Sequence, residues 1–149
     1  MMTTVKRKKA AGTWFNALAA LTGLVGLIAA FVSSSMTTTY TLGNLPQIAL
    51  LSVCGIVLSV LAALLPLRFG SRDLLGSASV LGAIALYTAA FGSVLAERIL
   101  LIAGLFSYDS VNTVGWQVFY ATCVSFAGFL IADLALIIGA FLENAKEIA

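Results

Sequence analysis

Residues 10–67 carry no charged side chain, and they read AAGTWFNALAALTGLVGLIAAFVSSSMTTTYTLGNLPQIALLSVCGIVLSVLAALLPL. A transmembrane helix needs roughly 20 consecutive apolar residues to cross about 30 Å of hydrocarbon. This stretch is long enough for two such helices, and the polar segment at 33–47 separates them. We therefore predict membrane spans at residues 13–32 and 48–66, with Pro66 marking the end of the second span.

The second half of the chain contains two more apolar stretches of the same length. Residues 74–96 are again uncharged, and the apolar character continues to Phe106, which predicts a third span at 77–103. A fourth span is predicted at 116–141, and Asp133 is its one charged residue. The predicted fold class is an all-α membrane protein with four transmembrane helices.

The composition supports a membrane protein and excludes several other classes. The 149 residues are 61% hydrophobic and 9% charged, whereas a soluble domain carries about 25% charged residues. A soluble globular protein, a disordered chain and a nucleic-acid partner are therefore excluded, and the length predicts a single domain over 1–149. With no His, two Cys and no CxxC or glycine-rich phosphate loop, we expect no metal, no cofactor and no enzyme activity.

The basic residues predict the orientation of the four spans. Six of the eight basic residues flank the same ends of the predicted helices, and they are Lys6, Arg7, Lys8, Lys9, Arg68 and Arg72. Lys and Arg are enriched in cytoplasmic loops, so these residues are predicted topology anchors with both chain termini in the cytoplasm. The apolar run at 13–32 is too long for the core of a cleaved signal peptide. We expect the chain to be retained in the plasma membrane with the lipid bilayer around it.

Small residues recur at alternating spacings of three and four in every predicted span. Such an alternation averages 3.5 residues, which is the period of a left-handed helical seam, and small residues let membrane helices approach closely. We therefore predict a compact left-handed bundle with its large apolar side chains facing outward. The predicted packing glycines are Gly23, Gly26, Gly55, Gly82, Gly92, Gly128 and Gly139. The alternative is that Ala, Gly and Ser are so frequent in these spans that a spacing of three and four residues can be found among them by chance.

Asp133 is the most informative polar residue, because an ionisable side chain inside a membrane span indicates a functional site by default. It could serve as a proton or cation site, or it could bind a basic residue of a partner. The alternative is a hydrogen-bonded residue that only joins helices. The adjacent helical positions are apolar, so a partner group must come from another helix or another chain.

Glu97 and Arg98 are predicted to lie at the outer boundary of the third span. Adjacent residues on a helix are about 100° apart, so the two side chains do not share a face. Arg98 could bind Asp109 in the following loop or reach the lipid headgroups. One interpretation is an interfacial charge pair that ends the span, and the alternative is a polar contact that holds the outer end of the span against a partner. Cys54 and Cys123 are predicted at similar depths, either as free thiols or as a disulfide if their helices touch.

The segment SVLAERILLIAGLFSYDSVNTVGWQVFYATCVSFAGFLIADLALIIGAFLE combines a third span that ends near an Arg, a polar outer loop and a fourth span that closes in IIGAF. Over residues 80–142 the chain resembles small four-helix membrane proteins of unknown function from Gram-positive gut bacteria. The topology is also similar to that of MARVEL and claudin proteins. Claudins carry a Trp and paired Cys in the first external loop, and residues 33–47 contain neither.

Three functions are compatible with these features. The first is an accessory, assembly or structural subunit of a membrane complex or homo-oligomer, whose partner is another membrane protein or the chain itself. The second is a small oligomeric transporter or channel that uses Asp133. The third is an enzyme acting on lipid, for which Arg68, Arg72 and Asp73 could bind a phosphate headgroup. The absence of a catalytic set and the short loops favour the first.

Overall fold

Four long helices form a bundle in the computed structural model, which describes residues 7–9, 11–36, 41–69, 74–107, 111–142 and 145–147. The helices are α1 (Ala11–Ser35), α2 (Leu45–Phe69), α3 (Leu74–Ser107) and α4 (Thr113–Ala140). Each contains a segment long and apolar enough to cross a membrane. The predicted four-helix membrane fold is therefore confirmed, while the left-handed sense of the bundle stays a prediction.

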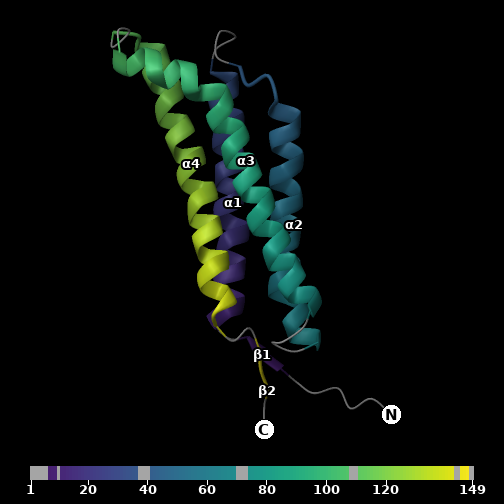
Figure 1. The fold of residues 1–149 in the computed structure, drawn as a ribbon. Coiled ribbons are helices and arrows are strands. Elements are labelled where there is room, and N and C mark those ends of the chain that lie inside the picture. Colours follow the sequence, from purple (N-terminus) through teal and green to yellow (C-terminus); the bar gives the residue numbers. More distant parts are fainter. Residues whose placement is uncertain are drawn as a thin grey trace.

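The helices pack in a ring in which each contacts its two neighbours. α1 lies against α2 and α4, and α3 also lies against α2 and α4, so α1 faces α3 across the middle. Successive helices run in opposite directions, and the last part of α3 bends aside before the chain enters α4 (Figure 1). At 34 residues α3 is about 51 Å long, which exceeds the hydrocarbon thickness and leaves room for this bend.

Two short strands pair beyond one end of the bundle (Figure 1). These are β1 (Arg7–Lys9) and β2 (Ala145–Glu147), and they are antiparallel with Arg7 opposite Glu147. β1 also contacts α2. The sequence pattern does not predict these strands, because three-residue segments carry too little periodicity to indicate one.

Small and hydroxyl-bearing side chains make up much of the interior of the bundle, and most of the large aliphatic side chains face outward. Ala19, Ala83 and Ala132 are fully buried, whereas Leu21 and Leu81 are mostly exposed. This is the reverse of a soluble bundle, and it suits a lipid environment. Lipid tails give little hydrophobic drive between helices, so close packing and hydrogen bonds must hold the bundle together.

The helix ends follow local chemistry more than the length of the apolar runs. Pro46 lies in the first turn of α2, where a missing N–H costs no hydrogen bond. Asn112 caps α4, with its Oδ1 accepting a hydrogen bond from the Gly115 N–H at 3.0 Å. The second span is predicted to end at Pro66, and the helix α2 continues beyond that residue to Phe69.

Candidate functional site

Asp133 lies on α4 at the surface where α4 meets α3, about 10 Å along the helix from its C-terminal end. Its side chain is half-buried, and its Oδ2 accepts a hydrogen bond from Thr88 Oγ1 of α3 at 2.9 Å. The partner group therefore comes from another helix, as the apolar neighbours on α4 predicted. Thr88 itself is exposed, so the pair opens onto the outside of the bundle.

The second carboxylate oxygen of Asp133 has a different environment. Oδ1 is buried and has no hydrogen-bond partner among the residues that the structure describes. Along α4, Phe129 and Leu136 are fully buried while Leu130 and Ile137 are about half exposed. Asp133 thus lies at the edge between the packed interior and the lipid-facing surface.

Tyr87, the residue before Thr88, points the opposite way and fills the centre of the bundle. It is fully buried, and its hydroxyl lies 3.3 Å from the Ala19 carbonyl of α1 and 3.1 Å from Ser59 Oγ of α2. A Cβ built on Gly23 would lie 2.5 Å from the ring Cε1, and one on Gly55 would lie 2.9 Å from the same atom. The ring therefore occupies a slot that two glycines leave open.

Sequence reasoning missed Tyr87, although a signal was present. Aromatic residues with a polar group usually lie at the membrane boundary, and Tyr87 falls in the middle of the predicted third span. A buried tyrosine hydroxyl needs a hydrogen-bond partner, so its position indicated a polar contact inside the bundle. Its aromatic neighbour is Phe129 of α4, with ring centroids 6.2 Å apart. Tyr87 therefore connects α3 to the other three helices.

The seam between α1 and α4 is a close contact between backbones. A Cβ on Gly128 would lie 2.7 Å from the Gly26 Cα and 2.8 Å from the Thr22 carbonyl oxygen. Next to this contact, Ser125 Oγ donates a hydrogen bond to the Gly26 carbonyl at 2.8 Å. A side chain at Gly128 would have to push backbone aside, so glycine is required there.

The remaining predicted packing glycines divide into two groups. A Cβ on Gly139 would lie 3.1 Å from the Phe15 Cβ of α1, and one on Gly82 would lie 2.9 Å from a Leu58 methyl group of α2. Both glycines therefore lie at helix contacts. Gly92 differs from the prediction, because it is exposed and an added Cβ would meet no atom within 4 Å. Although Gly92 belongs to the small-residue pattern of α3, it lies on a face of the helix that points away from the bundle.

Asn16 of α1 donates a hydrogen bond to a backbone carbonyl of α2 that has no donor within its own helix. Within α2, the Ala62 carbonyl would accept from the N–H of residue 66, but Pro66 has no N–H. Asn16 is buried, and its Nδ2 donates to the Ala62 oxygen at 3.3 Å. A neighbouring helix can supply the donor that a proline removes in a membrane span, and this explains why α2 continues past Pro66.

Arg98 lies inside the bundle rather than at an interface with headgroups. It is only 2% exposed, and its Nη2 donates to Ser33 Oγ of α1 at 3.2 Å. Ser33 in turn donates to the Ala30 carbonyl at 2.9 Å. The prediction that Arg98 reaches the headgroups is wrong, because α3 extends to Ser107 and turns this side chain inward. The predicted partner Asp109 lies outside the described residues.

Glu97 is exposed, as its place on a different face from Arg98 requires. A Cβ on Gly43 would lie 3.6 Å from Glu97 Oε2, so this carboxylate is close to the connection between α1 and α2. Along α3 it is nine residues from Thr88, or about 14 Å of rise. Glu97 and Asp133 are therefore too far apart to act as a carboxylate pair.

The two cysteines are free and exposed. Cys54 is on α2 and Cys123 on α4, two helices that lie diagonally across the bundle, so the possible disulfide is not formed. Among the described residues, no group of three or more His, Cys, Asp or Glu is placed to hold a metal ion.

Four of the six predicted topology anchors lie in described elements at the end of the bundle where the strands pair. Arg7, Lys8 and Lys9 form β1, and Arg68 lies in α2 near its end. Lys6 and Arg72 lie outside the described residues.

Comparison with known proteins finds no matching family model, no similar curated protein and no similar solved structure.

Proposed function

We propose that this chain is an accessory or assembly subunit that binds another membrane protein through the surface formed by Asp133 and Thr88. The observation that carries the proposal is the position of this polar pair on the outside of a bundle whose other large exposed side chains are mostly aliphatic. A carboxyl group facing hydrocarbon is unfavourable by roughly 2.5–3.5 kcal/mol near the centre of a span. A partner helix that covers it removes this penalty.

The chemistry of the pair indicates what the partner presents. Thr88 supplies one hydrogen bond to the carboxyl group, and Oδ1 lacks a donor among the described residues. Arg98 is the only Lys or Arg within the four spans, and it is buried against Ser33 elsewhere. Because Oδ1 is buried, a partner helix reaches the pair through the exposed Thr88 and the exposed part of Asp133, where it is expected to bring its own hydrogen-bond donor, an Arg, Lys, Ser, Thr or Asn side chain.

The transporter or channel is the competing function, and the buried hydroxyl groups count against it. Ser52 donates to the Ile48 carbonyl and Thr122 to the Val118 carbonyl, each on its own helix. Both side chains are fully buried and already bonded to the backbone of their own helix, so they do not line a path that is open to water or ions. Asp133 alone would have to carry the transported species.

The test is purification of a tagged chain from its own host in a mild detergent, followed by mass spectrometry and measurement of the particle mass. We expect a second membrane protein in stoichiometric amount with the wild type and its loss with Asp133→Leu. Leu21→Ala, on the exposed face of α1, is the control and retains the partner. A particle that contains only this chain would contradict the proposal, and ion flux through Asp133→Asn would then test the transporter.

The free energy of unfolding of the purified chain separates an interface role from a structural one. Because Asp133 is half-buried at the edge of the lipid-facing surface, Asp133→Leu is expected to leave that free energy unchanged within about 0.5 kcal/mol, or to raise it. Unfolding of both variants in detergent micelles with increasing sodium dodecyl sulfate measures the difference. A loss of more than about 1 kcal/mol would show that Asp133 holds this bundle together instead.

We also propose that the protein lies in the plasma membrane with both termini in the cytoplasm. The support is the basic residues that flank the end of the bundle where β1 and β2 pair.

A further inference from the structure

The last part of α3 extends past the end of α1. The hydrogen bond from Arg98 to Ser33 Oγ shows which residues of the two helices lie at the same level. α1 ends at Ser35, two residues after Ser33, whereas α3 ends at Ser107, nine residues after Arg98. About seven more residues of α3 than of α1 therefore continue at this end of the bundle, or roughly 10 Å of helix.

α2 begins at the same level, and the start of α4 accompanies the end of α3 beyond it. Asn44, the residue before α2, donates a hydrogen bond to the Ser93 carbonyl of α3 at 3.4 Å. Further along α3, the ring of Phe106 lies against that of Trp116 in α4, with centroids 5.2 Å apart. We call this part of the molecule the α3–α4 extension, and it comprises residues 99–107 and 113–117.

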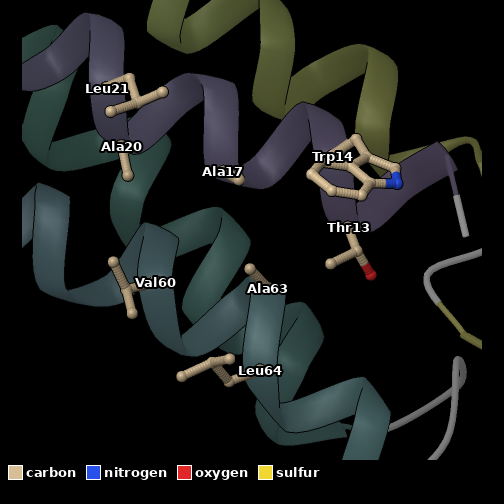
Figure 2. Close-up of a pocket in the computed structure, with 8 residues that line it drawn as sticks. All are labelled: Thr13, Trp14, Ala17, Ala20, Leu21, Val60, Ala63 and Leu64. Atoms are coloured by element: carbon tan, nitrogen blue, oxygen red, sulfur yellow. The ribbon is translucent and has the colours of Figure 1, made fainter. Parts of the chain in front are cut away.

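The hydrocarbon thickness can be placed along α1. Trp14 is in the first turn of α1, is 63% exposed, and stands on the outside of the bundle beside the groove between α1 and α2 (Figure 2). Tryptophan is enriched at the boundary between hydrocarbon and headgroups. Ser33 is 19 residues further along α1, or about 28 Å of rise, and the hydrocarbon is about 30 Å thick. The second boundary therefore lies near Ser33 and, on α3, near Arg98.

Glu97 supports this position of the second boundary. Its side chain is exposed on the outside of α3, and a carboxylate that faces hydrocarbon is unfavourable. Glu97 is therefore expected at headgroup level. The α3–α4 extension begins directly beyond it, and yet Asp109 is the one charged residue from 99 to 132.

The exposed side chains of the extension are unsuited to water. Ile99, Leu100 and Phe106 are 57%, 85% and 67% exposed. A straight α3 would carry its last nine residues about 14 Å beyond the boundary, through the headgroups and into water. The last part of α3 instead bends aside from the axis of the bundle (Figure 1). The bend turns this segment toward the plane of the membrane.

An aromatic cluster holds the extension against α4. The ring of Phe106 also lies 5.5 Å from that of Phe119, and Trp116 lies 6.1 Å from Tyr120, measured between ring centroids. Tyr120 is 62% exposed, so the cluster reaches the outside of the molecule. Tryptophan and tyrosine combine an apolar ring with a polar group and favour the headgroup level. The side chains that join the two helices are therefore the types that the membrane interface favours.

We propose that the α3–α4 extension binds the surface of the bilayer, where it lies in the interface with its exposed apolar side chains among the upper acyl chains. Apolar faces of interfacial helices are buried about 5–10 Å into the boundary between headgroups and acyl chains. The extension contains no basic residue, so its binding does not require anionic lipid. The proposal is independent of the partner at Asp133, which is 13 residues, or about 20 Å, along α4 from Tyr120.

The test measures the depth of spin labels in phosphatidylcholine vesicles by electron paramagnetic resonance. In a Cys54→Ala, Cys123→Ala background, one label is attached at Leu100→Cys or at Phe106→Cys. The depth follows from collisions with oxygen, which is enriched in lipid, and with a water-soluble nickel chelate. We expect both labels about 5–10 Å below the headgroups. A label at Ala85→Cys, which is exposed and about 18 Å along α3 from the level of Glu97, is the reference inside the hydrocarbon.

A charge in the extension tests whether lipid holds it in the interface. Leu100→Asp is expected to move the label at Phe106→Cys out of the acyl chains, because an exposed carboxylate favours water. Gln117→Asp is the matched control, since it adds the same charge at an exposed polar position of the extension, and it is expected to leave the depth unchanged. Phosphatidylglycerol in the vesicles is expected to change neither label depth.

Labels that collide mainly with the nickel chelate at both positions would overturn the proposal, because the extension would then project into water. Labels shielded from both oxygen and nickel would also overturn it, by showing that protein covers the surface. Broadening of the spectrum by a neighbouring label would identify that protein as a second copy of the chain. Leu100 takes no part in the aromatic contacts of Phe106, so its label keeps the test valid if Phe106→Cys disturbs the packing.

Discussion

At the scale of single residues, the most demanding contact is the one between Tyr87 and the glycines that surround it. The ring is fully buried and touches three helices, so it has no free space into which it could move. Its hydroxyl is also anchored, with Ala19 and Ser59 within hydrogen-bond distance. A methyl group added at Gly23 would therefore overlap a ring that cannot shift without breaking polar contacts.

Gly23→Ala is expected to lower the free energy of unfolding by about 1–3 kcal/mol, the usual effect of overpacking a core. Gly92→Ala is the matched control, because it makes the same chemical change in α3 where an added Cβ meets nothing within 4 Å. There the substitution should be neutral or raise stability by up to about 1 kcal/mol, since alanine favours the helix. Unfolding of both variants in mixed micelles measures the difference, and equal effects would contradict this account of Tyr87.

Sequence patterns predicted Asp133 as a site because its charge stands alone in an apolar span. They could not identify Thr88, whose role depends on how α3 is rotated against α4. The burial of Arg98 could not be predicted for the same reason. Hydropathy places this charge at a membrane boundary, but the rotation of α3 turns it into the bundle. The identity of a residue is visible in the sequence, but its partner across the bundle is not.

At the scale of the helices, the apolar runs predicted how many spans there are but not where the helices end. Hydropathy marks the part of a helix that lies in hydrocarbon, and a helix continues beyond it as long as its backbone groups find partners. α2 shows this clearly, because it continues past Pro66, and Asn16 of α1 donates to the Ala62 carbonyl that Pro66 leaves without an N–H donor in its own helix. The junction of α1 and α2 therefore depends on two residues that are far apart in the sequence.

A double-mutant cycle on Asn16 and Pro66 tests this junction. Asn16→Ala alone leaves the Ala62 carbonyl without a donor and is expected to cost about 1–3 kcal/mol of unfolding free energy. In the Pro66→Ala background, the N–H of residue 66 can donate to the Ala62 carbonyl. Asn16→Ala should then lower the free energy of unfolding by about 0.5–1.5 kcal/mol less than it does in the wild type. Additive effects within about 0.3 kcal/mol would show that Asn16 stabilises the bundle by packing alone.

At the scale of the whole molecule, the pairing of β1 with β2 joins the two ends of the chain at the same end of the bundle (Figure 1). The connection from α2 to α3 is at that end as well, and the connections α1–α2 and α3–α4 are at the other. Charge follows the same division, since the segments 33–47 and 107–115 contain no Lys or Arg. The fold and the distribution of charge therefore both distinguish a basic end of the bundle, where β1 and β2 pair, from an opposite end without basic loop residues.

Reporter fusions test which end faces the cytoplasm. Because basic segments stay on the cytoplasmic side, a reporter active only there should work when it follows Ala149 and fail when the chain is cut after residue 40 or residue 110. The reverse pattern would place the termini outside and would contradict the orientation. Replacing residues 6–9 by Gln should weaken the bias without reversing it, since Arg68 and Arg72 still flank the same end. A complete reversal in that variant would mean that the N-terminal cluster alone sets the orientation.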